Sequence, residues 1–419
     1  MIPVYLAVAL LYFLFIPEQF NFRIFGVYLP PYRVFVMAGA IYLLAGAFSG
    51  RLRFAWPDLF IASAVAWVWL ASYMTSGSIG TALVQGGAHT IDIALAYFLA
   101  RVGIQSPRDL RLFLIASAPG LAIISATVVL EAITHVRIIQ SAASAVTGQP
   151  MPLRGDTRMG LLRGAANFPH PILAGIFLAS FLTIFLGSGI KGWPKLFGIF
   201  AAMGAFFSMS SAALLGLVFG ALLWAYNWLT ERFYNFSWRL LLAFSSVVFV
   251  IVETVSNTGT YGLLVRYASL NTASAYNRIL IWKYGTENIE RNPFFGIGYD
   301  DWDRPDWMHS GSFDHFWLIM ALRFGIPASI LLIFATVWGV YCVARNSESL
   351  GSVDRRLLRG VAIALAVFAL GVNSVSLWLS ALVWFFMLLG IAVSLGDYKQ
   401  PRIIRYRWHV ENSSEKASA

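Results

Sequence analysis

The sequence predicts an all-α integral membrane protein in which about twelve helices, and at least ten, cross the bilayer. Hydrophobic residues occupy 58% of the 419 positions and charged residues only 12%, whereas soluble proteins carry about 25% charged residues. Apolar runs of about 15–20 residues recur along the chain, the length that a membrane-crossing helix needs. The runs are continuous and do not alternate, which favours helices over a barrel. A soluble enzyme, a disordered chain and a coiled coil are excluded.

Each apolar run is predicted to form one helix of a polytopic bundle. The first run lacks a basic leading segment and a cleavage site, so we expect it to be retained as a membrane span. The runs 2–16, 34–48 and 196–208 are short, which gives the lower count of ten. The predicted spans are Ile2–Ile16, Val34–Phe48, Trp56–Met74, Ile79–Ala100, Leu110–Leu130, Pro171–Ser188, Leu196–Ser208, Ala212–Leu229, Leu240–Val255, Phe316–Ala344, Leu357–Val375 and Leu377–Leu395.

The formal net charge of +10 follows the predicted membrane topology. With both termini in the cytoplasm, more than half of the 30 Lys and Arg residues fall on cytoplasmic segments, as the positive-inside rule requires. This distribution removes nucleic acid as a partner. The single cysteine, Cys342, excludes an intramolecular disulfide and any cysteine-based metal site.

The chain is predicted to be a single integral membrane domain, 1–419, with two long segments on the outer face. These are 131–170 and 256–315, and loops of such length are usually functional. Within the second, an amphipathic helix is expected over Ser274–Arg291. The segment 397–419 is interpreted as a basic cytoplasmic tail, and Glu131 as an interfacial residue at a span end.

Arginines gather in both outer segments, against the inward trend of the other basic residues. An arginine offers a planar fork that matches pairs of phosphate oxygens, so several of them at a membrane surface suit a lipid-linked diphosphate. The simpler alternative is that each pairs with a lipid head group or with a carboxylate of its own loop. The residues are Arg154, Arg158 and Arg163 in the first segment, and Arg266, Arg278, Arg291 and Arg304 in the second.

The second outer segment also collects carboxylates and histidines. They are Asp300, Asp301, Asp303, Asp306, His309, Asp314 and His315. Oxygen ligands of this kind can bind a divalent cation, but the spacing matches no dedicated calcium loop, and we predict no metal. Asp314 and His315 stand where the loop re-enters the membrane, where a partly dry site can tune a general base. Alternatively, Asp314 caps the helix that begins at Phe316.

Two further charged positions fall inside predicted spans. Arg323 lies seven residues into the helix that begins at Phe316, about 10 Å below its start. At that depth it needs a polar cavity or a partner, so it is either a site residue or the partner of a carboxylate such as Asp314. His89 and Asp92 share one helix face. The pair could act as the proton relay of a transporter, or it could be a hydrogen-bonded pair inside the bundle.

Several stretches resemble the O-antigen polymerase and ligase superfamily, and in particular its Wzy-type and exopolysaccharide polymerase-like members. The resemblance covers roughly 153–333, and the large loop is its most specific part. The stretches are Arg158-Met159-Gly160-Leu161-Leu162-Arg163-Gly164, Asn167-Phe168-Pro169-His170-Pro171, Ser208-Met209-Ser210-Ser211, Asn277-Arg278-Ile279-Leu280-Ile281-Trp282, Asn292-Pro293-Phe294-Phe295-Gly296-Ile297-Gly298, Asp314-His315-Phe316-Trp317-Leu318 and Arg323-Phe324-Gly325-Ile326-Pro327.

The resemblance implies a GT-C-like membrane glycosyltransferase that uses undecaprenyl-diphosphate-linked glycans at the outer face of the bacterial cytoplasmic membrane, without a cofactor. Its arginines would bind the diphosphate; by position these are Arg158, Arg163 and Arg278. Many ligases carry a histidine followed by Asn at the start of the helix after the large loop. Here Asp314 and His315 occupy these two positions, which is more similar to exopolysaccharide-type polymerases.

We therefore expect a polymerase of O-antigen or exopolysaccharide repeat units, in the inner membrane. Its expected catalytic residues are Asp314 or His315 as the base, with Arg323 beside it. Secondary candidates for the site are Arg154, His170, Arg291 and His309. The expected partners are lipid-linked glycans and membrane lipid, with a chain-length regulator and a flippase as further candidates. A ligase that transfers finished polymer to an acceptor, and a secondary transporter, are the alternatives.

Overall fold

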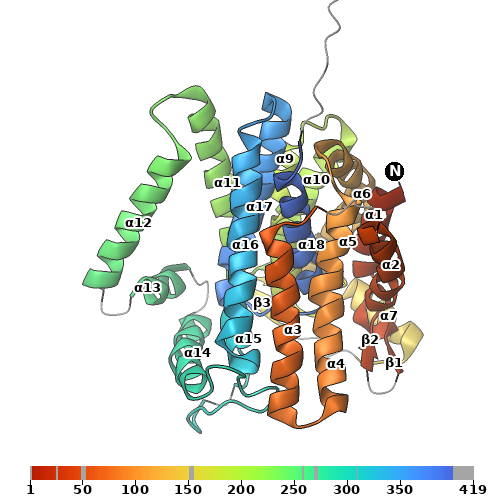
Figure 1. Cartoon of the computed structure of the whole chain (residues 1–419), viewed down its shortest axis with the longest axis vertical. Coiled ribbons are helices and arrows are strands. Elements are labelled where there is room, and N and C mark those ends of the chain that lie inside the picture. The colour runs from red at the N-terminus through yellow and green to blue at the C-terminus, as the bar shows by residue number, and fades with distance from the viewer. Residues whose placement is uncertain are drawn as a thin grey trace, which may run out of the picture.

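The computed structural model describes residues 2–24, 27–48, 53–150, 155–256, 259–268, 272–308 and 310–399, and it is almost entirely helical. Most helices stand side by side in a bundle, accompanied by two short hairpins (Figure 1). The predicted fold class, an all-α polytopic membrane protein, is confirmed.

The first half of the chain supplies one side of the bundle and part of the loops at its end. A π-helical turn, η2, interrupts the fourth predicted span. The elements are α1 (Ile2–Leu14), η1 (Glu18–Phe20), β1 (Phe22–Ile24), β2 (Val27–Leu29), α2 (Pro31–Phe48), α3 (Trp56–Ser76), α4 (Ile79–His89), η2 (Thr90–Leu95), α5 (Ala96–Gly103), α6 (Pro107–Thr134), α7 (Ile138–Thr147), β3 (Thr157–Arg158), β4 (Leu161–Leu162), α8 (Pro171–Ala179), α9 (Phe181–Gly187), α10 (Trp193–Met203) and η3 (Gly204–Ser208).

The second half completes the bundle and adds the large loop segment. Figure 1 shows α12, α13 and α14 beside the bundle rather than within it. The elements are α11 (Ser211–Arg232), α12 (Trp238–Val255), α13 (Gly259–Ala268), α14 (Thr272–Arg291), α15 (Phe316–Phe324), α16 (Ile326–Ser347), α17 (Ser352–Gly371), η4 (Val372–Ser374) and α18 (Leu379–Gly396).

All twelve predicted spans are helical in the structure, but by length and composition fewer of them can cross a membrane. Among the described residues, eight helices are long and apolar enough to do so. Pro3–Leu14 and Pro171–Gly187 are apolar but shorter. The count of ten to twelve crossings therefore stays a prediction. One predicted span, Phe316–Ala344, is two helices, because Gly325 adopts a φ of 85° that ends α15 before α16 begins.

The core of the bundle is α18, which is buried over almost its whole length. Trp384, near its middle, stacks on Phe181 with ring centroids 4.5 Å apart and donates a hydrogen bond of 2.9 Å to Ser180. Around α18 lie α5, α16 and α17. A helix that is apolar on all sides is expected at the centre of a bundle.

Both ends of the described chain lie at one end of the bundle, which we call the terminal face. A side chain on Gly103 would meet the backbone of Pro3, so the start of α1 adjoins the end of α5. Arg101, two residues before Gly103, binds Asp397 at 3.0 Å, just after α18. Asp397 and the two residues after it are thus part of the fold; 400–419, the rest of the predicted tail, lies outside the described residues.

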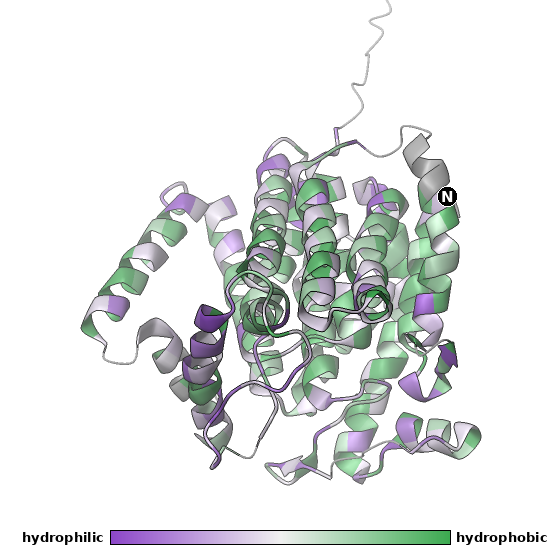
Figure 2. Ribbon diagram, turned by 60° about the horizontal axis from the view of Figure 1, so that its bottom comes forward, coloured by the Kyte–Doolittle hydropathy of each residue, from purple (hydrophilic) through white to green (hydrophobic). Residues whose placement is uncertain are grey.

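The opposite end, the loop face, carries β1, β2, α7 and α14 (Figure 1). The helix expected over Ser274–Arg291 is α14, and α7 and α13 are further short helices within the two long segments. Beside the bundle, α12 has no buried residue and is largely hydrophobic (Figure 2). Lipid is the surrounding that suits such a helix, since most of its exposed side chains between Arg239 and Glu253 are apolar.

Candidate active site

The first arginine-bearing segment folds as a tight hairpin. Arg158 pairs with Leu161 in the β3–β4 ladder, and the two turn residues between them have positive φ angles. Arg158 donates a hydrogen bond of 3.0 Å to the carbonyl of Met209, between η3 and α11. Arg163 follows β4 and is 4% exposed. The hairpin therefore presents both arginines beside the start of α11.

Glu131 fixes the backbone that follows Arg163. Its side chain is completely buried and accepts hydrogen bonds from the backbone N–H groups of Ala165 and Ala166, at 2.9 and 3.0 Å. It also forms an ion pair with Arg137 at 3.2 Å. The interpretation of Glu131 as interfacial is wrong, because the loop folds over it and takes its oxygens as acceptors.

Replacing Glu131 by alanine is expected to lower the free energy of unfolding by about 3–5 kcal/mol, since the buried charge of Arg137 would lose this carboxylate and two buried N–H groups would lose their acceptor. A thermal unfolding curve of the purified protein measures the loss. Glu131→Gln keeps an acceptor for the two backbone N–H groups, so its loss should be smaller. Equal stability of wild type and Glu131→Ala would contradict this anchoring role.

The second arginine-bearing element is α14. Arg278 and Trp282 lie one turn apart on the same face of this helix, and Arg278 is 6% exposed. Trp282 stacks on Tyr261 of α13 at a centroid distance of 4.6 Å, and both rings lie within 6 Å of the His315 ring. The face of α14 that carries Arg278 is therefore turned towards the start of α15.

The three arginines that were predicted to bind a diphosphate lie close together, although they come from two separate segments. Burial and the charges of Arg158, Arg137 and Arg278 lower the pKa of Arg163 to about 10, although Asp156 of the same loop opposes the shift and pairs with Arg163 at 3.5 Å. Burial and the charge of Arg278 likewise lower the pKa of Arg158. The guanidinium groups remain charged at neutral pH. They repel one another in a partly buried site, and a bound anion would relieve this repulsion.

Asp314 and His315 lie at the start of α15, next to this cluster. Burial raises the pKa of Tyr261 to about 12, with Arg278 opposing the rise and Asp314 adding to it, so Tyr261 senses both charges. The helix cap is His315, not Asp314: its Nδ1 accepts the backbone N–H of Leu318 at 3.2 Å. The prediction that Asp314 caps α15 is wrong by one residue.

His315 is 3% exposed and its burial lowers its pKa to about 4. Because Nδ1 accepts the cap hydrogen bond, the neutral ring carries its proton on Nε2. Within the described part of the chain, Nε2 has no hydrogen-bond partner. His315 is therefore arranged to donate a hydrogen bond from Nε2 at neutral pH, and it is a poor base.

Arg323 lies apart from the other candidates. Its guanidinium stacks over the ring of Tyr299 at 4.4 Å, at the far end of α15 from Asp314. The ring of His89 lies 4.8 Å from that of Phe324. Asp92 does not form the expected pair with His89 but a bidentate ion pair with Arg33, at 2.6 and 2.9 Å. The structure thus separates Arg323 from Asp314 and from Arg158, Arg163 and Arg278.

The secondary candidates for the site are not brought together with the three arginines in any described contact. Arg291 pairs with Asp303 at 2.6 Å, and both side chains are largely exposed, as in the simpler alternative for these arginines. His170 caps α8 by accepting the N–H of Ile172 at 3.2 Å. Arg154 and His309 lie outside the described residues. Where side chains are described, no three or more His, Cys, Asp or Glu residues gather as a metal ion would need.

Two of the stretches that carry the family resemblance contact each other. The backbone N–H groups of Ile297 and Gly298 donate to the carbonyls of Leu322 and Arg323, at 2.8 and 3.0 Å. A side chain on Gly325 would collide with the carbonyl of Phe294. These stretches therefore hold the loop against the junction of α15 and α16, and they position the site rather than line it.

A cavity of about 720 Å³ opens on the loop face, between the segment from Glu18 to Tyr28 and the end of α7. None of the arginines of the site is among the described residues that line it.

Three residues of the site and its surroundings were not predicted from the sequence: Arg137, Tyr261 and Trp282. Tyr261 and Trp282 carry no charge signal, and only the closeness of Trp282 to Arg278 on one helix face could have indicated it.

The comparison with protein families supports the expected resemblance. The family described as O-antigen ligase matches residues 196–333, about a third of the chain. The match includes Arg278, Asp314 and His315, while Arg158 and Arg163 lie before it. No curated protein matches the chain. Members of the matched family are glycosyl-transferring membrane enzymes. Residues 196–333 are thus similar to the O-antigen ligase family, in line with the resemblance to the O-antigen polymerase and ligase superfamily.

Proposed function

We propose that the protein is a membrane glycosyltransferase that polymerises undecaprenyl-diphosphate-linked oligosaccharide repeat units into O-antigen or exopolysaccharide. The observation that carries the proposal is the approach of Arg158 and Arg163 to Arg278, from two segments more than a hundred residues apart. The family match supports the broader class of chemistry. No cofactor is needed, because the lipid diphosphate is itself the leaving group.

The arginines would stabilise the leaving group. As the anomeric carbon–oxygen bond of the growing chain breaks, the electron pair and the negative charge go to the lipid diphosphate. Arg163 is well placed for this, because its buried Nε and one terminal nitrogen have no hydrogen-bond partner among the described residues. Cations fixed in advance in a water-poor place stabilise a developing charge more than they stabilise the ground state.

Asp314 is the better candidate for the general base. The hydroxyl of the incoming repeat unit attacks the anomeric carbon, and its proton must pass to a nearby acceptor. His315 is disfavoured, since its Nδ1 is used by the helix cap and its Nε2 carries a proton. We assign His315 the donation of a hydrogen bond from Nε2 to a substrate oxygen, and Asp314 the acceptance of the proton.

The placement in the cell follows from the same proposal. The terminal face would lie in the cytoplasm and the loop face in the periplasm of a bacterial inner membrane, where lipid-linked repeat units are presented. The exposed apolar surface of α12 supports contact with lipid beside the site. A flippase that delivers the units and a chain-length regulator are the expected partners.

Incubation of the purified protein with a lipid-linked repeat unit tests the proposal. A ladder of products that differ by one repeat unit is expected, together with release of the lipid diphosphate. The substrate incubated without protein gives the background. Recovery of the substrate unchanged, with protein that is folded and inserted in lipid, would refute the polymerase.

The second candidate is a ligase that transfers finished polymer to an acceptor, and the description of the matched family favours it. The two activities leave different intermediates in a deletion strain. Loss of a polymerase leaves single lipid-linked repeat units, whereas loss of a ligase leaves long lipid-linked polymer. Analysis of the lipid-linked pool therefore separates the two candidates.

A further inference from the structure

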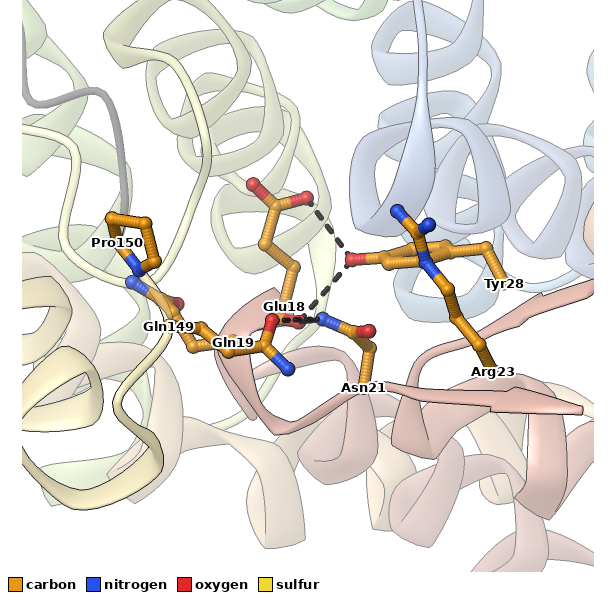
Figure 3. Close-up of a pocket in the computed structure, with 7 residues that line it drawn as sticks. All are labelled: Glu18, Gln19, Asn21, Arg23, Tyr28, Gln149 and Pro150. Atoms are coloured by element: carbon orange, nitrogen blue, oxygen red, sulfur yellow. Dashed lines mark hydrogen bonds between the residues drawn. The ribbon is translucent and has the colours of Figure 1, made fainter. Parts of the chain in front are cut away.

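The cavity on the loop face is built from two segments that are distant in sequence. Its volume of about 720 Å³ lies within the roughly 300–1,000 Å³ that is typical of small-molecule sites. Figure 3 shows side chains of both segments around it. The lining residues are Glu18, Gln19, Asn21, Arg23, Tyr28, Gln149 and Pro150.

The lining selects a neutral, hydroxyl-rich ligand. Most of its side chains end in an amide, a carboxylate, a guanidinium or a phenol, and large apolar side chains are absent from its described wall. A lipid chain would find no large aliphatic side chain to pack against there. A free anion is also disfavoured, since Glu18 and Arg23 balance each other in charge. Amide groups donate to and accept from hydroxyl groups, and carboxylates accept from them, so the wall can bind the neighbouring hydroxyl groups of a sugar ring.

Hydrogen bonds within the wall hold these groups in place before any ligand arrives. Asn21 donates to the carbonyl of Glu18 at 2.7 Å and to the side-chain oxygen of Gln149 at 2.8 Å, so it joins the two segments. The Tyr28 hydroxyl donates to the carbonyl of Glu18 at 3.2 Å. Preorganised groups lose little entropy when they bind.

One buried polar atom in the wall lacks a partner. Gln19 is 3% exposed, and its Oε1 has no hydrogen bond within the described part of the chain. Leaving a buried acceptor without a hydrogen bond destabilises the protein. A rotation of the Gln19 amide into the cavity would let a ligand hydroxyl donate to this oxygen.

The cavity is connected to the arginine cluster through the protein. Gln19 donates from Nε2 to the carbonyl of Gln140 in α7, at 3.3 Å. Gln140 in turn donates from its side chain to the carbonyl of Phe168, in the loop that follows Arg163.

We propose that this cavity is a saccharide-binding subsite that holds sugars of the glycan while the diphosphate is at the arginines. The proposal rests on the proposed function, since it assigns the cavity to the same glycan substrate. The subsite recognises hydroxyl groups, so it binds the oligosaccharide without its lipid and without its diphosphate.

Binding of a free oligosaccharide to the full-length protein in lipid nanodiscs tests the subsite. The probe is the oligosaccharide released by mild acid from the lipid-linked pool of the producing cells, followed by saturation-transfer NMR and calorimetric titration. Glu18→Gln and Gln149→Ala should each weaken binding about tenfold, by loss of one or two hydrogen bonds. Ser141→Ala, an exposed position on α7 outside the cavity, is the matched control and should bind as the wild type does.

The arginine site gives the second arm of this experiment. Arg278→Ala should bind the free oligosaccharide with unchanged affinity and make no polymer. One outcome is a product ladder from the wild type while Glu18→Gln and Gln149→Ala bind the oligosaccharide as tightly as the wild type does. This result would refute the subsite and leave the proposed polymerase activity supported. Oligosaccharide binding that these two substitutions weaken, without any ladder, would instead refute the polymerase and retain the carbohydrate site. Thermal unfolding of each variant shows that it is folded.

Discussion

Replacement of Arg278 by alanine is expected to abolish detectable polymer, with a fall in rate of at least about 10²–10³ fold. This is the usual effect of removing one preorganised group that stabilises developing charge. Arg278 is buried on α14 and is the one arginine of the cluster that comes from the second outer segment. Arg163→Ala should have the same effect. The product ladder of the purified variants measures both, with protein level and membrane insertion followed on immunoblots.

Two substitutions on α14 control for damage to the helix. Lys283→Ala removes an exposed cation from α14 and should leave the rate unchanged. Arg278→Lys keeps the charge but loses the planar fork, so a partial rate is expected. Full-length polymer from both Arg278→Ala and Arg163→Ala would remove the diphosphate-binding role from these residues.

Asp314→Asn is expected to reduce the rate by about 10²–10⁴ fold, which is the range for loss of a general base. Asparagine has nearly the same shape, so the loop and the start of α15 should keep their structure. Single-turnover measurement of chain extension isolates the chemical step from substrate binding. A rate for Asp314→Asn within a few fold of the wild type would show that another group accepts the proton.

His315→Asn provides the contrast. Asparagine can still cap α15, whereas the hydrogen bond from Nε2 is lost, so a smaller loss than for Asp314→Asn is expected. With a pKa of about 4, His315 gains a proton only below that pH and stays neutral from pH 5 to 8. The pH dependence of the rate above pH 5 should therefore keep its shape in this variant. A larger loss in His315→Asn than in Asp314→Asn would exchange the two roles.

The helices could be predicted because hydrophobic runs of membrane length leave the backbone no alternative to a helix. The breaks within these helices were harder to predict from the sequence. Pro327 in the sequence suggests a kink, but the break occurs at Gly325, since Pro327 is tolerated in the first turn of α16 while Gly325 takes up the left-handed backbone. The π-helical turn at Thr90–Leu95 carries no comparable signal.

The approach of Arg158, Arg163 and Arg278 was predictable from the family resemblance, whereas the chemistry of arginine alone pointed equally to Arg154, Arg266, Arg291 and Arg304. The position of Arg323 was not, since depth along a helix does not tell which neighbour it meets; the neighbour is Tyr299. The burial of Glu131 was equally hidden. Two of its partners are backbone N–H groups more than thirty residues away, and such partners leave no mark in the sequence.

The stretch between Tyr299 and Phe313 begins and ends at fixed points. The N–H groups of Ile297 and Gly298 are held before it, and His315 caps α15 after it. Because lengthening a closed surface loop costs only about 0.6 kcal/mol per doubling, a reporter or an epitope can be grafted at its exposed tip, near Asp306. The insertion has to stay at this tip, because Trp302 and Met308 on either side of it are buried among side chains of α14 and α15.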